Sequence, residues 1–379
     1  MNPTWRILPE DWQAAHRLAD ACGLDPIMGQ LLLNRGLRTP EQAQSFLSPS
    51  LETLSEPGTV RDLPRAVARL RQAIARRETI VIFGDSDADG LTASVILYEA
   101  LRDLGAAVVV RLSNRLTDGY GLPQRLIHSM SRSSTKLVVL VDCGTNQPEA
   151  VQRLADQDIE TIIVDHHVPL DRRATPYALI NPHVHGDPVH RDLSSAGLAF
   201  KVAQALLNGT ADERLAAFLD VAALGTLADC GPLRGDNRTL VTLGIGRIVS
   251  SARPGLARLC AVTRTTRPQP EHVVQRLVPR LNASGRLGHP EAIWRLLVRD
   301  GTRLLDPWMA RAEAAHARTK QLYRQMVAQA QEQVNRFHFR DQFVIKFQEF
   351  GNHRIDISGE FGYLFYCLFL FFRDSRDEC

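Results

Sequence analysis

The sequence predicts an α/β fold: an open, mostly parallel sheet with helices on both faces, followed by a helical half and a long connecting helix. Continuous apolar runs at 79–85, 106–112, 136–142 and 161–165 lack the polar alternation of a strand that has one wet face. Helical segments separate these runs, which is typical of parallel strands joined by crossover helices. Over residues 195–251 helical periodicity replaces the strands, so we expect helices to complete the domain.

Apolar spacing and end signals predict the helices. Residues 63–77 carry apolar side chains at helical spacing, so this segment packs one face just before the first strand. Segments 91–105 and 147–158 predict the crossover helices after the first and third strands, and the second strand is expected to be as buried as the others. Asp306 is typical of an N-cap, and we expect a long helix from there to about Phe337.

Composition indicates a globular protein of a reducing compartment. The chain has 379 residues, 44% of them hydrophobic, which is enough to bury a sizeable core. Its six cysteines show no CxxC spacing and its N-terminus lacks the features of a signal peptide, so we expect a cytoplasmic location. The longest apolar run, 363–372, is too short to span a bilayer. The net charge of +3 does not by itself indicate nucleic-acid binding, although arginine greatly outnumbers lysine.

Acidic side chains follow three of the predicted strands, at the edge of an open parallel sheet where ligands collect. Taken singly, an aspartate after a strand is more often a turn residue or a helix N-cap. Aspartates at three strand ends of one sheet favour a functional site instead. The helical half supplies one further candidate site residue, Asp229. The acidic and histidine side chains concerned are Asp85, Asp87, Asp89, Asp142, Asp165, His166, His167 and Asp229.

Such a cluster of carboxylates needs cations. Two carboxylates about 4 Å apart repel each other by about 4 kcal/mol at an effective dielectric near 20, and a whole domain is stable by only about 5 to 15 kcal/mol. The groups must therefore protonate or bind metal. A mixed set of oxygen and imidazole ligands suits Mn²⁺, or Mg²⁺ with fewer nitrogens. Two such ions can activate a water and stabilise both oxygens of a phosphoryl displacement.

Five motifs, in this order, resemble those of the DHH phosphoesterase superfamily: "GDSDADG", "VDCGTN", "VDHH", "ALGTLADCGPL" and "PRLNASGRLG". The last one narrows the resemblance to the RecJ type, the single-strand-specific 5′ to 3′ DNA exonucleases, and the likeness covers about residues 5–337. It implies a metal-dependent nuclease of DNA repair and recombination that acts on single-stranded DNA with two Mn²⁺ or Mg²⁺ ions. A single-strand-binding protein or a helicase is the implied protein partner.

The resemblance also implies a role for each site residue. Asp85 would bind one metal ion and Asp142 would bridge both ions. The ligands of the second ion would be Asp87, His166 and Asp229. Asp89 and Asp165 would orient these ligands, and His167 would face the substrate phosphate. The residues implied to grip the neighbouring phosphodiester are Arg280, Asn282 and Arg286.

Three features depart from the family pattern. Phe83 stands where some relatives have a histidine, Ser86 stands where many have an aromatic residue, and "DCG" replaces the commoner "DNG". The histidines of the loop that contains "NPHVHGDPVHRD" could suggest another metal site, but hydrogen-bonded histidines are the favoured interpretation.

The resemblance divides the chain into five expected parts. They are a helical lead-in (1–60), a DHH catalytic domain (61–255), a phosphate-binding region (256–303), a connecting helix (304–337) and an atypical tail (338–379). RecJ proteins continue into a DHHA1 domain and an oligonucleotide-binding fold, whose motifs do not appear in this sequence. We therefore expect a chain truncated or frameshifted before those domains, with a loosely attached, phenylalanine-rich tail and impaired activity. A newly evolved tail would give the same pattern.

Two other functions stay open at this point. Some relatives are phosphodiesterases for short oligonucleotides or cyclic dinucleotides, and others are non-catalytic scaffolds that have lost their metal ligands. The presence of all the expected ligands argues against a scaffold.

Overall fold

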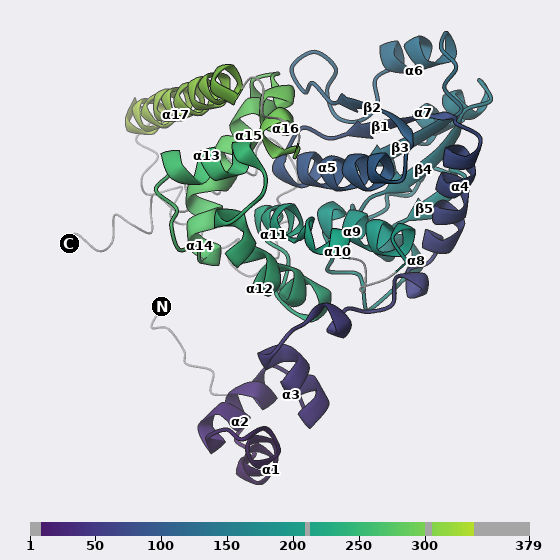
Figure 1. Ribbon diagram of the computed structural model, residues 1–379. Coiled ribbons are helices and arrows are strands. Elements are labelled where there is room, and N and C mark those ends of the chain that lie inside the picture. Colours follow the sequence, from purple (N-terminus) through teal and green to yellow (C-terminus); the bar gives the residue numbers. More distant parts are fainter. Residues whose placement is uncertain (1–8, 209–212, 300–304, 337–379) are drawn as a thin grey trace. The chain divides into compact units, whose positions relative to one another are not determined.

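The computed structural model describes residues 9–208, 213–299 and 305–336, with backbone alone for the last four (Figure 1). The chain divides into two compact units, residues 1–319 and 320–379. The tail expected at 338–379 lies outside the described residues. Within the described ranges, no helix combines the length and the apolarity that crossing a membrane requires.

A five-stranded sheet forms the centre of the first unit, and every pair of neighbouring strands in it is parallel. Its order is β2-β1-β3-β4-β5, so the predicted open parallel sheet is confirmed. The strands are β1 (Thr79–Gly84), β2 (Ala107–Leu112), β3 (Leu137–Val141), β4 (Glu160–Val164) and β5 (Ala178–Ile180).

Helices cover both faces of this sheet (Figure 1). Because successive side chains of a strand point to opposite faces, Ile82 and Val139 join one hydrophobic cluster while Phe83 and Val138 join the other. The helices packed on the first face include α4 (Leu63–Ala75), α5 (Ala88–Asp103) and α9 (Ser195–Leu206), and α11 (Leu219–Ala228) packs in turn on α5 and α9. Those on the second face are α6 (Gln124–Ser131) and α7 (Pro148–Ala155).

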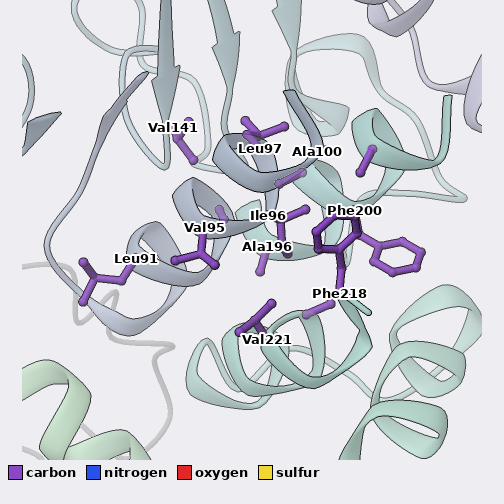
Figure 2. Close-up of a cluster of buried hydrophobic side chains, with 14 of the residues drawn as sticks. Leu91, Val95, Ile96, Leu97, Ala100, Val141, Ala196, Phe200, Phe218 and Val221 are labelled. Atoms are coloured by element: carbon purple, nitrogen blue, oxygen red, sulfur yellow. The ribbon is translucent and has the colours of Figure 1, made fainter. Parts of the chain in front are cut away.

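The larger cluster fixes α5 against the helical half. Figure 2 shows Ile96 of α5 beside Phe200 of α9 and Phe218, which directly precedes α11. Both phenylalanines are fully buried, and each such burial contributes about 1.5 to 3 kcal/mol. The first turn of α5 follows directly on the acidic loop after β1, so this packing also fixes the position of that loop.

The remaining elements form the lead-in and the rest of the helical part. The lead-in consists of α1 (Trp12–Cys22), α2 (Pro26–Asn34), α3 (Pro40–Leu47) and two 3₁₀ turns, Leu51–Thr53 and Pro57–Thr59. Further along the chain lie α8 (Pro182–His185), α10 (Glu213–Ala216), α12 (Gly235–Val249), α13 (Pro254–Val262), α14 (Pro270–His272), a π-helical turn (Val273–Leu277), α15 (Val278–Arg286) and α16 (Pro290–Leu297). The long connecting helix is confirmed as α17 (Leu305–Arg336), but the N-cap prediction was wrong, because Asp306 lies inside the first turn.

A chain of polar side chains ties the lead-in to the helical half. The Ser55 hydroxyl lies 2.6 Å from Asp236 Oδ2 and 2.8 Å from His190 Nε2. Lys201 Nζ lies 2.6 Å from the same Asp236 carboxylate, and His190 Nδ1 lies 2.6 Å from Asp187. Since the hydroxyl has one proton and faces a charged carboxylate, it donates to Asp236. His190 is therefore a hydrogen-bonded group of this network.

Two other local predictions were wrong. The second strand, β2, is half-buried because it lies at the edge of the sheet, with a neighbour on one side alone. Helix α5 begins at Ala88 instead of Leu91, because Asp87 caps it by accepting a hydrogen bond from Gly90 N over 3.1 Å.

Candidate metal centre

Strand register brings the predicted acidic residues together. Gly84 pairs with Val141, and Val141 pairs with Val164, so the next residue of each strand stands at the same edge of the sheet. These next residues are Asp85, Asp142 and Asp165. Their backbone N–H groups continue the ladder, for example from Asp142 N to Val164 O over 2.9 Å. The carboxylates are therefore held by the sheet and not by mobile loops.

Asp85 and Asp87 share the guanidinium of Arg115. Asp85 is buried and accepts from Ser113 Oγ over 2.6 Å. Arg115 Nη2 forms an ion pair with Asp85 and a second one with Asp87 over 3.1 Å. Ser113 and Arg115 reach the site because β2 is the neighbour of β1 and its following loop passes over the end of that strand.

Asp142 combines burial with an unusual backbone conformation. Its φ of 60° lies in the left-handed region, which aspartate tolerates better than most residues. Its Oδ1 accepts from Ser195 Oγ over 2.9 Å and lies 3.5 Å from His166 Nε2. Burial, with the nearby negative charges of Asp87 and Asp89, raises the pKa of this carboxyl well above its usual value.

Asp89 points from the first turn of α5 to the start of α9. It accepts from Ser195 N over 2.7 Å and from Ala196 N over 2.9 Å, so it occupies the positive end of that helix. Burial and the charge of Asp229 outweigh these hydrogen bonds and raise the pKa of Asp89 to about 7. Asp89, which the resemblance implied would orient the metal ligands, is thus itself a member of the charged cluster.

His166 lies among three carboxylates. Its Nε2 is 3.5 Å from Asp142 and 3.8 Å from Asp89, and its Nδ1 is 3.7 Å from Asp229 at the end of α11. Burial alone would lower the pKa of His166, but these carboxylates outweigh it and raise the pKa to about 10. The imidazolium therefore offsets part of the negative charge of these carboxylates.

Asp165 hydrogen-bonds the ring of His167 and not the ring of His166. Its Oδ1 lies 2.7 Å from His167 Nδ1 and also accepts from the backbone N–H of both histidines. These bonds, with the one from Thr145 N over 3.1 Å, outweigh burial and lower the pKa of Asp165 to about 2. The ring of Tyr120 packs edge-on against His167, with centroids 5.8 Å apart.

Three groups of side chains have ligand atoms that all lie within 4.8 Å of one another. One group is Asp85, Asp87 and Asp142, a second is Asp89, His166 and Asp229, and a third is Asp142, His166 and His167. Oxygen and imidazole donors of this kind fit Mn²⁺ or Mg²⁺. The raised pKa values of Asp89, Asp142 and Asp229 fit as well, because they report negative charge that the described side chains do not fully offset.

Helix α15 packs on the acidic loop and carries the three residues predicted to bind a phosphodiester. Asn282 Oδ1 accepts from Ala88 N over 2.8 Å, which caps the start of α5. Arg280 points to α17, where its Nε lies 2.7 Å from Glu313. Arg286 is exposed at the last turn of α15. Between them, Gly285 lies so close to Ser86 that a Cβ there would be 2.0 Å from the Ser86 carbonyl oxygen.

Sequence reasoning missed four residues of this centre: Ser113, Arg115, Tyr120 and Ser195. The first three follow β2, and they reach the site because β2 lies next to β1, an order that the apolar runs do not reveal. Ser195 had a usable signal, because Ser194 before it is a typical N-cap and a helix start attracts carboxylates.

Comparisons with known proteins identify relatives of this chain. The family model "DHH family, N-terminal domain" matches residues 79–226. The single-stranded-DNA-specific exonuclease RecJ of Bacillus subtilis (strain 168) is 30% identical over 87% of this chain and 42% of its own length. A crystal structure of exonuclease RecJ bound to manganese has a TM-score of 0.68 and 31% identity, over 72% of this chain and 70% of that one.

A second solved structure, RecJ of Thermus thermophilus in complex with Mn²⁺, has a TM-score of 0.71 and 28% identity, over 84% of this chain and 46% of that one. The chain spans about half the length of the curated relatives it matches, or 42% to 48% of the first three.

Proposed function

Because this chain belongs to the DHH family, in the branch formed by the RecJ exonucleases, we propose that it hydrolyses phosphodiester bonds of single-stranded DNA from the 5′ end with two divalent metal ions. The observation that carries the proposal is the crowding of buried carboxylates at three strand ends, with two histidines beside them. Such crowding is unfavourable unless cations balance it.

The geometry suggests how the ligands divide between two ions. Asp85 and Asp87, with Asp142, would hold one ion, and His166 with Asp229 would hold the other. Asp142 lies in reach of both groups, which supports its bridging role. This division differs from the expected one in moving Asp87 to the first ion. The bound ions would supply an activated water and stabilise charge on the reacting phosphate.

Two carboxylates have positioning roles in this proposal. Asp89 is anchored by two N–H groups of α9 and can orient His166, and its place beside His166 and Asp229 also makes it a candidate ligand of the second ion. Asp165 accepts from His167 Nδ1, so the opposite nitrogen, Nε2, remains to face a substrate phosphate. The pair also raises the pKa of His167 despite burial, which favours a proton on that ring.

Helix α15 would hold the DNA strand beside the phosphate that reacts. Asn282 caps the helix that follows the acidic loop, so its amide lies beside the proposed ligands. Arg286, one helical turn further on, shares its face of α15 and is exposed. The ion pair of Arg280 with Glu313 supports a role in holding α15 to α17 more than direct contact with DNA.

The wider assignments rest on the same family membership. We propose that residues 61–255 form the catalytic domain, that residues 1–60 and 256–303 flank it as lead-in and phosphate-binding region, and that residues 304–337 connect onward. A single-strand-binding protein or a helicase is the proposed type of partner, and repair or recombination of DNA is the proposed process.

The proposal is tested by nucleotide release from 5′-phosphorylated single-stranded DNA with Mn²⁺, Mg²⁺ or a chelator. We expect release of mononucleotides with either metal, none with the chelator, and little from blunt duplex DNA. Faster hydrolysis of a cyclic dinucleotide than of DNA would assign the chain to the phosphodiesterases of the superfamily. If calorimetry shows that the chain binds metal but neither substrate is hydrolysed, the proposal that the chain is a hydrolase is wrong.

A further inference from the structure

A groove of about 600 Å³ lies between the lead-in and the start of α12, and its lining includes none of the candidate metal ligands. Its apolar lining includes Met28 and Leu31 of α2, Phe46 of α3, and Leu233. Met28, Leu31 and Leu233 are 40%, 42% and 37% exposed. Large apolar side chains that gather in one exposed groove, instead of being scattered, mark interaction sites.

Helix α2 is more apolar than its packing requires. Leu32 is buried in the hydrophobic cluster of the lead-in, and Gly29 lies so close to α1 that a Cβ would be 2.1 Å from the Ala15 carbonyl oxygen. Met28 and Leu31 belong to none of the hydrophobic clusters of the described residues and face the groove instead. Their apolar character therefore has no structural use in the described part of the chain.

Two arginines give this apolar groove a positive charge. Arg35 Nη1 donates to the Leu31 carbonyl over 3.2 Å, and Arg238 Nε donates to the Phe46 carbonyl over 2.5 Å. Among the described side chains, no carboxylate pairs with either guanidinium, whereas the neighbouring Arg234 lies 2.6 Å from Asp192. Burial and the positive charge of Arg35 lower the pKa of Arg238, which shows that the two charges act on each other.

We propose that this groove is a docking site for an acidic, amphipathic segment of a partner protein. A large apolar side chain of that segment would rest on Met28 and Leu31, while its carboxylates would face Arg35 and Arg238. Charge complementarity argues for an acidic partner, because carboxylates would relieve the repulsion between the two guanidinium groups. The apolar floor argues for a peptide that carries anchoring side chains of its own.

Two other occupants fit the groove less well. Single-stranded nucleic acid usually stacks its bases on open aromatic faces, but Arg238 covers the ring of Phe46 at 3.5 Å from the ring centroid. A second copy of this chain would present the same two arginines in a symmetric contact, which would bring like charges together.

The test is fluorescence anisotropy of the full chain with a short fluorescein-labelled peptide in which Asp and Glu flank Leu and Phe. We expect Arg35→Glu and Leu31→Ser each to raise the Kd at least about tenfold. Two matched controls change the same residue types outside the groove: Arg17→Glu on α1, and Ile27→Ser at a side chain that is 62% exposed. We expect both controls to leave the Kd unchanged, and added salt to weaken binding to the wild type.

Three further measurements complete the design. A peptide with Lys in place of the acidic residues should not bind, and circular dichroism of each variant checks that it is folded. Equal Kd values for groove variants and controls would overturn the proposal. The proposal would also be overturned if the groove variants lost binding to a single-stranded oligonucleotide and not to the peptide. A wild-type dimer in analytical ultracentrifugation that Leu31→Ser converts to a monomer would overturn it as well.

Discussion

In the helical half, Arg253 lies buried between Glu99 and Asp220, whereas at the ends of the strands buried carboxylates crowd together around a half-exposed Arg115. Arg253 Nη1 lies 2.8 Å from Glu99, and its Nε lies 3.0 Å from Asp220. A second cation, Arg299, lies 2.8 Å from Glu99. Each carboxylate of this cluster therefore has a guanidinium of the chain beside it.

The metal centre lacks this balance. Arg115, which is 41% exposed, pairs with Asp85 and Asp87, but Asp142, Asp89 and Asp229 are left with His166 as their nearest positive group. A buried charge cluster that is matched internally offsets its own desolvation cost, whereas an unmatched one stays unfavourable until something binds. Residual charge, more than burial or acidity, therefore distinguishes the candidate site.

The largest expected effect comes from making the same change in both clusters. Asparagine tolerates the left-handed conformation of residue 142, so Asp142→Asn removes a charge without backbone strain. If Asp142 is the shared ligand that we propose, the variant should lower kcat/KM for single-stranded DNA at least about a hundredfold under saturating Mn²⁺. Its metal-free stability should stay equal or rise, since a repelling charge is gone.

Asp220→Asn is the matched control for that change, since it also removes one buried carboxylate charge. It should lower stability while leaving kcat/KM of the folded fraction close to that of the wild type. Assays combined with urea unfolding separate these outcomes. More than about a tenth of wild-type activity in Asp142→Asn would contradict the bridging role.

A large stability effect is expected where the internal cation is removed. Arg253→Met leaves Glu99 and Asp220 buried without their shared partner, which should lower the free energy of unfolding by about 3 to 5 kcal/mol. Arg247→Met, at an exposed position of α12, should change it by less than about 0.5 kcal/mol. Urea unfolding of both variants measures the difference. Equal values would mean that Arg253 does not balance the cluster.

Most of the sheet and the place of several candidate ligands could be predicted because they depend on local patterns. Apolar runs identified β1, β3 and β4, and the residue after each run then had to lie at the carboxyl edge. β5 was missed because three residues are too few to form a recognisable run. The start of α5 was misplaced because Asp87 serves as its N-cap, and that role is visible in the hydrogen bond to Gly90 and not in the apolar spacing.

The rest of the site depends on which strands are neighbours. Arg115 and Ser113 lie far from Asp85 in the sequence pattern and meet it because β2 pairs with β1. The two adjacent histidines could not be told apart by spacing either. Their different environments come from Asp165, which hydrogen-bonds the ring of His167, and from α11, which places Asp229 beside His166.

The comparison also predicts how the metal-free chain responds to pH. The pKa of Asp89 is about 7 against an ordinary value of 3.8, so the folded chain binds more protons than the unfolded chain between these values. Its stability should therefore fall as pH rises from about 4 to about 7. His166, whose pKa rises from 6.5 to about 10, extends the decline to higher pH. Thermal unfolding in chelator across this range measures the trend.

Metal loading provides the internal control for that experiment. Ligands must lose their protons to bind an ion, so saturating Mn²⁺ should raise the Tm more at high pH than at low pH. The Arg253 cluster should contribute little to either trend, because its carboxylates keep their guanidinium partners over the whole range. Metal-free stability that rises with pH would show that the carboxylates of the centre are already balanced.

The smallest effects are expected from variants that change how α15 packs on the acidic loop, residues 85–87. In Gly285→Ala, the new Cβ would meet the carbonyl of Ser86, which stands between Asp85 and Asp87, so α15 or the loop must shift. We expect a loss of about 1 to 3 kcal/mol in stability, together with weaker Mn²⁺ binding in calorimetry because the candidate ligands move.

Gly246→Ala is the matched control, since nothing lies within 4 Å of its Cβ on α12. There the better helix propensity of alanine should stabilise the chain by up to about 1 kcal/mol without changing Mn²⁺ affinity. Unchanged Mn²⁺ affinity in both variants would mean that α15 does not position the acidic loop, and that the sheet and the start of α9 hold the crowded carboxylates by themselves.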